Sequence, residues 1–221
     1  MKKMLTKTFT TAVLVTSIAT CSQAFATNLV INGSFENGST GFTSSYSTGS
    51  HNLFSAGQYE VGSNPQNYHP QFASILAEDG TNMMVVNGAE APGVPVWAES
   101  GLTVAAHTTY YFSTWVASVT APAPTTLQFN INGNSVGTLQ ATSSTDWQQF
   151  YTTWNSGDAT AVNISLVNLN THANGNDFAL DNIAFDTIAP ASAAVPEPAS
   201  AALIGLGLAG ISLLRRRHKK A

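Results

Sequence analysis

Basic side chains are missing from the middle of this 221-residue chain. No Lys or Arg lies between Thr27 and Val195, whereas eleven Asp and Glu do, so this stretch carries a formal charge of −11 when its histidines are neutral. Nucleic-acid binding needs basic groups that displace phosphate counterions, and a Schiff base needs a lysine. Arginine clamps on phosphates or carboxylates are excluded as well. Neutral molecules, cations and proteins remain as ligands, and no nucleic acid is expected among them.

Cysteine is nearly absent too. The single Cys21 lies within the first 26 residues, which show the parts of a secretory signal peptide in order. Lys2, Lys3 and Lys7 precede a largely apolar stretch, and Ala26 ends a small-x-small cleavage site. We therefore expect signal peptidase to cut after Ala26. The exported chain then has neither a disulfide nor a thiol nucleophile, so its core alone must stabilise it.

The sequence also lacks any long stretch with helical periodicity before its C-terminal tail. Short β-branched or aromatic stretches, several with alternating apolar and polar residues, are instead separated by Gly, Pro, Asn and Ser, which is typical of strands. Asn132-Gly133 marks the clearest hairpin, over residues 127–139. Parallel strands would need crossover helices, so we predict an all-β, antiparallel β-sandwich of the jelly-roll type. The expected strands cover residues 28–35, 58–61, 83–86, 110–119, 127–131, 148–154, 162–169 and 178–185.

The same pattern sets the expected domain boundaries. A signal peptide at residues 1–26 precedes the sandwich domain at 27–188, and a linker of small residues follows at 189–195. The remainder, residues 196–221, is a tail of different composition. Within the sandwich, residues 38–82 have few strand signals and are expected to supply long loops at one end.

Two stretches indicate more than the fold class. The first is Asn28-Leu-Val-Ile-Asn-Gly-Ser-Phe-Glu36, followed by Gly41-Phe42, and the second is Asn176-Asp-Phe-Ala-Leu-Asp-Asn-Ile183. They resemble the first and last strands of carbohydrate-binding modules with the galactose-binding-like jelly-roll fold. In those modules the corresponding two acids commonly coordinate a structural calcium ion, which takes six to eight hard oxygens. The resemblance implies this role for Glu36 and Asp181. The alternative is that Glu36 is a solvated turn acid and Asp181 accepts backbone hydrogen bonds.

Neutral sugars bind by stacking on aromatic rings, with amide and hydroxyl groups around the edge. Tyr68 and Trp97 lie in Pro-rich stretches typical of loops, so they are the candidate ligand-binding residues, with core packing as an equal alternative. Trp115, Trp147 and Trp154 lie in predicted strands, where aromatic side chains usually fill the interior.

No pattern of catalytic residues occurs. A glycoside hydrolase needs two carboxylates that face each other across the scissile bond, and no motif places such a pair. The histidines have no metal-ligand spacing, and neither Gly-x-Ser-x-Gly nor His-Glu-x-x-His is present. We therefore assign no catalytic residue and predict that the chain is not an enzyme, with a polysaccharide hydrolase as the less favoured alternative.

The tail combines three features in a fixed order. Pro196, Glu197 and Pro198 precede an apolar segment at residues 199–214, and a basic end follows at 215–220. This order resembles the PEP-CTERM sorting signal of Gram-negative bacteria, which implies that an exosortase recognises the tripeptide and removes the segment. A helix over 199–214 would be about 24 Å long against a hydrocarbon core of about 30 Å. We therefore expect a transient transmembrane helix, with a permanent C-terminal anchor as the alternative.

Together these features predict a non-catalytic exported protein. It would pass through an inner-membrane intermediate to the cell surface or the extracellular matrix, where its jelly-roll domain associates with neutral polysaccharide. The alternative is a structural or adhesive surface protein of the same fold without a specific sugar site.

Overall fold

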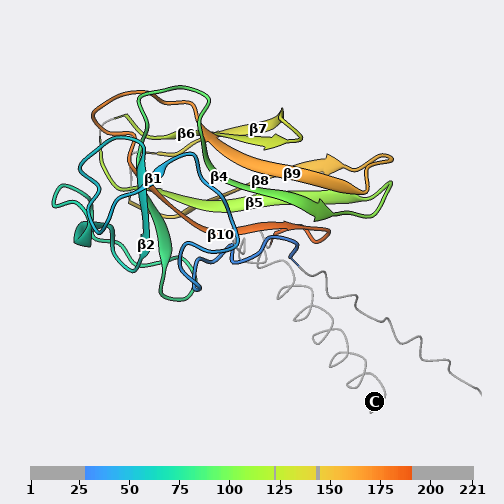
Figure 1. Ribbon diagram of the computed structural model, residues 1–221, viewed down its shortest axis with the longest axis horizontal. Coiled ribbons are helices and arrows are strands. Elements are labelled where there is room, and N and C mark those ends of the chain that lie inside the picture. Colours follow the sequence, from blue (N-terminus) through green and yellow to red (C-terminus); the bar gives the residue numbers. More distant parts are fainter. Residues whose placement is uncertain (1–27, 122, 143–144, 191–221) are drawn as a thin grey trace, which may run out of the picture.

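The computed structural model describes residues 28–190 except 122 and 143–144 (Figure 1). This part of the chain forms two β-sheets and one short 3₁₀ helix, η1 (Pro65–Asn67). Every strand pairing is antiparallel apart from the two-residue pairing of β1 with β2. The predicted all-β sandwich is therefore confirmed.

The two sheets contain six and four strands. The six-stranded sheet has the order β1 (Ser47–Thr48), β2 (Gln58–Gly62), β3 (Met83–Asn87), β10 (Phe178–Asp186), β5 (Thr109–Ser118), β8 (Gln148–Asn155). The four-stranded sheet has the order β4 (Pro95–Thr103), β9 (Ala161–Asn168), β6 (Thr126–Ile131), β7 (Asn134–Gln140). The last strand thus lies between β3 and β5, and the longer connections gather at the left end of Figure 1.

The main core lies between the sheets, because successive side chains of a strand point to opposite faces. Trp97 of β4 packs near Phe112 of β5, with ring centroids 6.4 Å apart, and Phe112 meets Phe129 of β6 edge to face at 5.0 Å. Phe178 and Phe185 of β10 are buried in the same cluster. These rings fill the interior that the sequence pattern predicted.

A second, smaller core lies on the outer face of the six-stranded sheet. Leu53 and Phe72, from the long connections around β2, cluster with Met83 and Val85 of β3 and Ala179 of β10. The strand-poor region predicted at 38–82 therefore does more than connect strands, because part of it covers one face of this sheet. That arrangement explains why both faces of β3 are buried.

The predicted hairpin over residues 127–139 is confirmed as β6 and β7. Asn132 and Gly133 have φ angles of 51° and 79°, and Ile131 pairs with Asn134 across the two-residue turn. Both turn residues therefore have positive φ, which Asn-Gly tolerates best and which matches the twist of the flanking strands.

Two strand predictions need correction. Residues 28–35 form turns and bends, because Asn32 and Phe35 have φ angles of 57° and 58°, which lie outside the region of a regular strand. The segment still contacts β10 through separate backbone hydrogen bonds, from Leu29 N–H to Phe185 O and from Ile183 N–H to Gly33 O. Conversely, β4 was missed because it begins with a proline. Proline is tolerated at the start of an edge strand, the place that β4 occupies.

The predicted signal peptide (1–26), most of the linker (189–195) and the tail (196–221) lie outside the described residues. In the part of the chain that the structure describes, no helix is long and apolar enough to cross a membrane.

Candidate ligand-binding site

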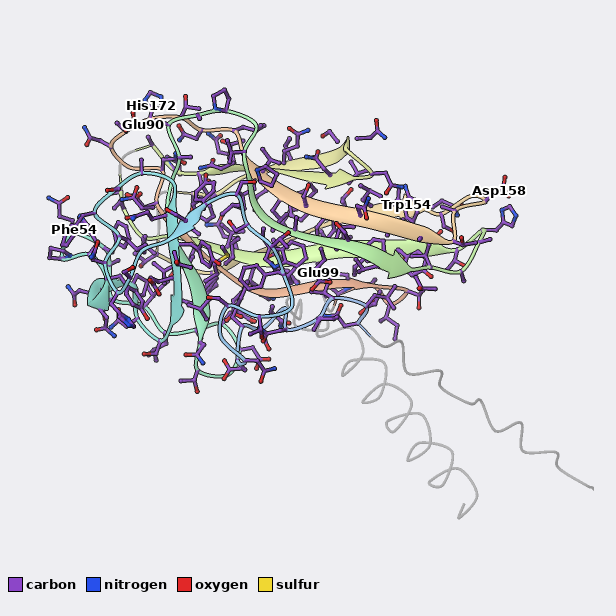
Figure 2. The ribbon with its side chains drawn as sticks, viewed as in Figure 1. Phe54, Glu90, Glu99, Trp154, Asp158 and His172 are labelled. Atoms are coloured by element: carbon purple, nitrogen blue, oxygen red, sulfur yellow. The ribbon has the colours of Figure 1, made fainter. Side chains whose placement is uncertain are left out.

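A cavity of about 560 Å³ opens where the connections gather at one end of the sandwich. Its walls come from the connections around η1 and from the segments that follow β5 and precede β10. We call it the loop-end pocket, and Figure 2 shows Phe54 at this end of the molecule. The side chains used below are Phe54, His69, Phe72, Asn87, Thr120 and Asp177.

The aromatic wall of the loop-end pocket is a row of three rings. Phe54 is 64 % exposed, although it is a large apolar side chain. Its ring meets the edge of His69 at 5.0 Å between centroids, and His69 lies 4.7 Å from Phe72, which is buried in the second core. The exposed ring therefore contacts His69, which in turn packs on a ring that is fixed in the second core, so Phe54 offers a supported apolar surface.

The polar wall is centred on Asp177. Its Oδ1 accepts the backbone N–H of Gly88 at 3.2 Å, and its Oδ2 accepts the hydroxyl of Thr120 at 3.0 Å. Burial raises the pKa of Asp177 to about 6, against the lowering effect of these two bonds. Asn87 donates its amide to Leu53 O at 2.8 Å. The pocket thus combines an exposed ring with amide, hydroxyl and carboxylate groups.

A buried amide network fixes the connection that carries Asp177. Asn176 has a φ of 66° and accepts the side-chain amide of Asn168 at 2.6 Å. Its own amide donates to Asn170 O at 2.7 Å. Gly88 lies so close that a Cβ there would meet Asn176 O at 2.1 Å. The sequence motif that suggested a carbohydrate-binding module therefore also contains residues that set the shape of this pocket.

Trp97 is not available for stacking on a sugar. It lies in β4, not in a loop, and its side chain is 0 % exposed in the main core. The prediction of Trp97 as a ligand-binding residue is wrong, because the Pro-rich stretch around it continues the four-stranded sheet. Its Nε1 has no hydrogen-bond partner among the described residues, so this position in the core includes the cost of one unsatisfied buried N–H.

Tyr68 lies near the loop-end pocket but does not line it. The half-buried ring packs against the second core, and its hydroxyl donates to Val61 O at 3.4 Å. Leu53 N–H bonds to Tyr68 O, which places the neighbours Phe54 and His69 at the pocket. The role predicted for Tyr68 stays untested, whereas the adjacent Phe54 has the exposure that stacking requires.

The other three tryptophans divide between packing and exposure. Trp154 packs against the main core beside Tyr110 and Phe185, and Trp147 packs against the second core. Trp115 instead points to the outer face of the six-stranded sheet, where it lines a hollow of about 330 Å³. The predicted interior position therefore fails for Trp115.

Glu36 and Asp181 both accept backbone hydrogen bonds from the connection that precedes β3. Glu36 Oε1 accepts the N–H groups of Thr81 at 2.8 Å and Asn82 at 2.7 Å, which lowers the pKa of Glu36. Asp181 Oδ2 accepts those of Glu78 and Asp79, at 2.8 and 3.1 Å. The two acids predicted to act together are thus brought to one loop.

A calcium ion on this pair would need the remaining oxygens. An oxygen that accepts two N–H bonds has no lone pair left for a cation, which leaves Glu36 Oε2 and the Oδ1 of Asp181. Asp181 Oδ1 already accepts Asn182 N–H at 2.7 Å. Among the described residues, no group of three or more His, Cys, Asp or Glu side chains is arranged to hold a metal. Calcium at Glu36 and Asp181 remains a prediction.

Sequence motifs do not mark Phe54, His69 and Asp177 as possible site residues. A signal for Phe54 was available, since it is a large aromatic residue within the polar and small stretch His51-Asn-Leu-Phe-Ser-Ala-Gly57. No comparable signal marks His69 or Asp177, because their meeting depends on how distant connections pack.

Comparison with known proteins identifies the tail. Residues 194–217 match the family model described as the PEP-CTERM protein-sorting motif, which includes Pro196, Glu197 and Pro198. The predicted sorting signal is confirmed. The motif indicates export and membrane-anchored sorting through an exosortase in a Gram-negative bacterium. None of the curated proteins compared with the chain is similar to it.

Solved structures resemble the sandwich in fold. One is a Stig cyclase from Fischerella sp. TAU, with 14 % identity, a TM-score of 0.54, and coverage of 73 % of this chain and 97 % of that chain. Another is the carbohydrate-binding module TmCBM61 in complex with β-1,4-galactotriose (14 %, TM-score 0.49, 72 % and 97 %). A third is the CBM22-1 xylan-binding domain of Paenibacillus barcinonensis Xyn10C (19 %, TM-score 0.46, 72 % and 94 %). At these identities the similarity concerns the fold alone.

Proposed function

We propose that this exported, tail-sorted chain is a non-catalytic protein of the cell surface or extracellular matrix that binds neutral polysaccharide in the loop-end pocket. The observation that carries the proposal is Phe54, which is exposed at the pocket and contacts His69, which packs on the buried Phe72. An exposed ring beside amide, hydroxyl and carboxylate groups is the arrangement that stacks on a sugar and bonds its hydroxyls.

The charge of the domain supports a neutral ligand. No Lys or Arg lies between Thr27 and Val195, so acidic polysaccharides would be repelled by a strongly negative body. Asp177 is the single carboxylate among the described residues that line the pocket, and both of its oxygens already accept hydrogen bonds. Hydrolysis of a glycosidic bond needs two carboxylates on opposite sides of that bond. Binding without hydrolysis is therefore favoured.

We expect the Phe54→Ala protein to bind a neutral polysaccharide about tenfold more weakly, because truncating a central aromatic contact typically removes more than ~1 kcal/mol. Affinity electrophoresis in gels that contain neutral polysaccharides measures this as lost retardation. The matched control is Tyr151→Ala, which removes a ring that is 48 % exposed on β8 and does not line the pocket.

Three outcomes separate the alternatives. Loss of retardation with Tyr151→Ala alone would move the binding site to the outer face of the six-stranded sheet. Absence of retardation in every neutral polysaccharide would favour the structural or adhesive protein without a sugar site. Release of reducing ends from the polymer would contradict the non-catalytic function.

Sorting through the tail predicts a shortened chain. Mass spectrometry of the mature protein, isolated from the cell surface or matrix, is expected to find a C-terminus near residues 195–198 and an N-terminus after Ala26. The exosortase and signal peptidase together would account for both ends. A mature protein that still ends at Ala221 would instead support a permanent anchor.

A further inference from the structure

A second hollow, of about 540 Å³, lies between β4 and the segment of residues 29–43. Five apolar side chains line it, together with three hydroxyl side chains and Glu99; the apolar ones are Leu29, Ile31, Phe42, Ala98 and Leu102. We call it the edge pocket, because β4 is an edge strand of its sheet. Figure 2 shows Glu99 in the middle of the molecule, well away from Phe54.

Glu99 is a buried carboxyl that is satisfied on one side only. Its side chain belongs to a residue that is 6 % exposed, and Oε1 accepts the N–H of Ile31 at 2.8 Å. None of the described residues donates a hydrogen bond to Oε2, and the side chain lines the edge pocket. The pairing of β4 with β9 shifts register between Glu99 and Leu102, so the strand is irregular directly after Glu99. Such irregularities commonly re-aim a side chain at a functional position.

The chemistry of the edge pocket selects its ligand. A largely buried carboxylate with one hydrogen bond and no counter-charge is unfavourable, and burial raises the pKa of Glu99 to about 7. The body has no Lys or Arg that could supply the missing cation. A calcium ion would need six to eight oxygens, which one carboxylate cannot provide. An anion would be repelled by Glu99, and a sugar would have only Glu99 and three hydroxyl side chains as polar partners against five apolar side chains.

We infer that the edge pocket binds a primary alkylammonium group, which donates to Glu99 Oε2 while its alkyl chain lies against Leu29, Ile31 and Phe42. The ammonium supplies the counter-charge that the protein lacks, and the apolar wall accommodates the stem, as lysine stems pack on apolar surfaces elsewhere. Ile31 is 66 % exposed, so the ligand would also cover an apolar side chain that otherwise faces water. Small amines and the lysine side chains of partner proteins both carry this group. The inference does not depend on polysaccharide binding, which uses a different pocket.

The test is an NMR titration of the purified protein with n-butylammonium, at about pH 8 so that Glu99 is ionised, and in about 0.15 M salt to screen the diffuse charge. The Ile31 amide is expected to shift as the ligand binds. Binding is expected to be about tenfold weaker or undetectable for n-butanol and for Glu99→Gln. This variant keeps an oxygen that accepts the Ile31 N–H, so the local structure is retained. Glu90→Gln, which removes the same charge at an exposed position, is expected to bind as the parent does.

Equal affinity for n-butanol and n-butylammonium would overturn the inference, as would unchanged binding by Glu99→Gln or the absence of any shift at Ile31. Nα-acetyl-lysine methylamide distinguishes the two sources. If it binds as tightly as n-butylammonium, the ligand is a lysine of another protein. If only n-butylammonium binds, the pocket selects small amines. Both of these results support the proposed ligand class, and neither bears on the loop-end pocket.

Discussion

Replacing Trp97 with alanine is expected to lower the free energy of unfolding by about 3–5 kcal/mol, the usual effect of truncating a large buried ring. The indole is 0 % exposed and lies beside Phe112 in the main core, with ring centroids 6.4 Å apart. The two sheets meet there, so the cavity left behind has little opportunity to collapse. Urea denaturation followed by circular dichroism measures the change.

Two further variants make this prediction specific. Trp97→Phe is expected to be much less destabilising, because it leaves a smaller cavity and removes an indole N–H that has no partner among the described residues. Trp154→Ala removes a half-buried ring on the edge strand β8 and is also expected to have the smaller effect. A Trp97→Ala protein that keeps its parent's denaturation midpoint yet no longer binds polysaccharide would restore Trp97 as a ligand-binding residue.

The stability of the protein is expected to fall as the pH rises from about 4.5 to about 7. Burial raises the pKa of Glu99 from 4.5 to about 7, so between these values the folded chain holds a proton that the unfolded chain has lost. At 1.36 kcal/mol per pKa unit, and after a discount for the solvent that reaches its carboxyl through the edge pocket, Glu99 contributes on the order of 1–2 kcal/mol to the decline. Burial also raises the pKa of Asp177 to about 6 and of Asp181 to about 7, which acts in the same direction.

The Glu99→Gln variant measures how much of this pH dependence of stability comes from Glu99. The variant is expected to match the parent at about pH 3.5, where Glu99 is protonated in both the folded and the unfolded chain, and to be more stable than the parent above about pH 7. Urea denaturation at several pH values measures both curves. Glu90→Gln provides the control, because Glu90 is exposed at the loop end (Figure 2). Parallel curves for the parent and Glu99→Gln would contradict the assignment, and so would a parent whose stability rises over this range.

Features that depend on composition or on short-range pattern could be predicted from the amino-acid sequence. The missing Lys and Arg set the charge of the domain, and alternation with frequent turn residues gave the all-β class. Asn132-Gly133 located the β6–β7 turn, since positive φ at two successive residues is a local requirement. The sorting motif was equally readable, because its three features follow one another along the chain.

Which side chains are buried, and which contact one another, depends on how the strands and connections pack in three dimensions. Trp97 and Phe54 both lie in stretches that read as loops, yet β4 joins the sheet and buries Trp97, whereas Phe54 stays exposed beside His69. Residues 28–35 have the composition of a strand. In the folded domain this segment instead has positive φ angles at Asn32 and Phe35 and makes separate hydrogen bonds to β10, which join the two ends of the sandwich domain. In the sequence nothing distinguishes Glu99 from the other ten acids of the domain. It becomes distinct in the fold, because the segment at Ile31 packs over it and donates a hydrogen bond to it. Burial, pKa and pocket shape depend on groups far apart in the chain, and local pattern does not record those contacts.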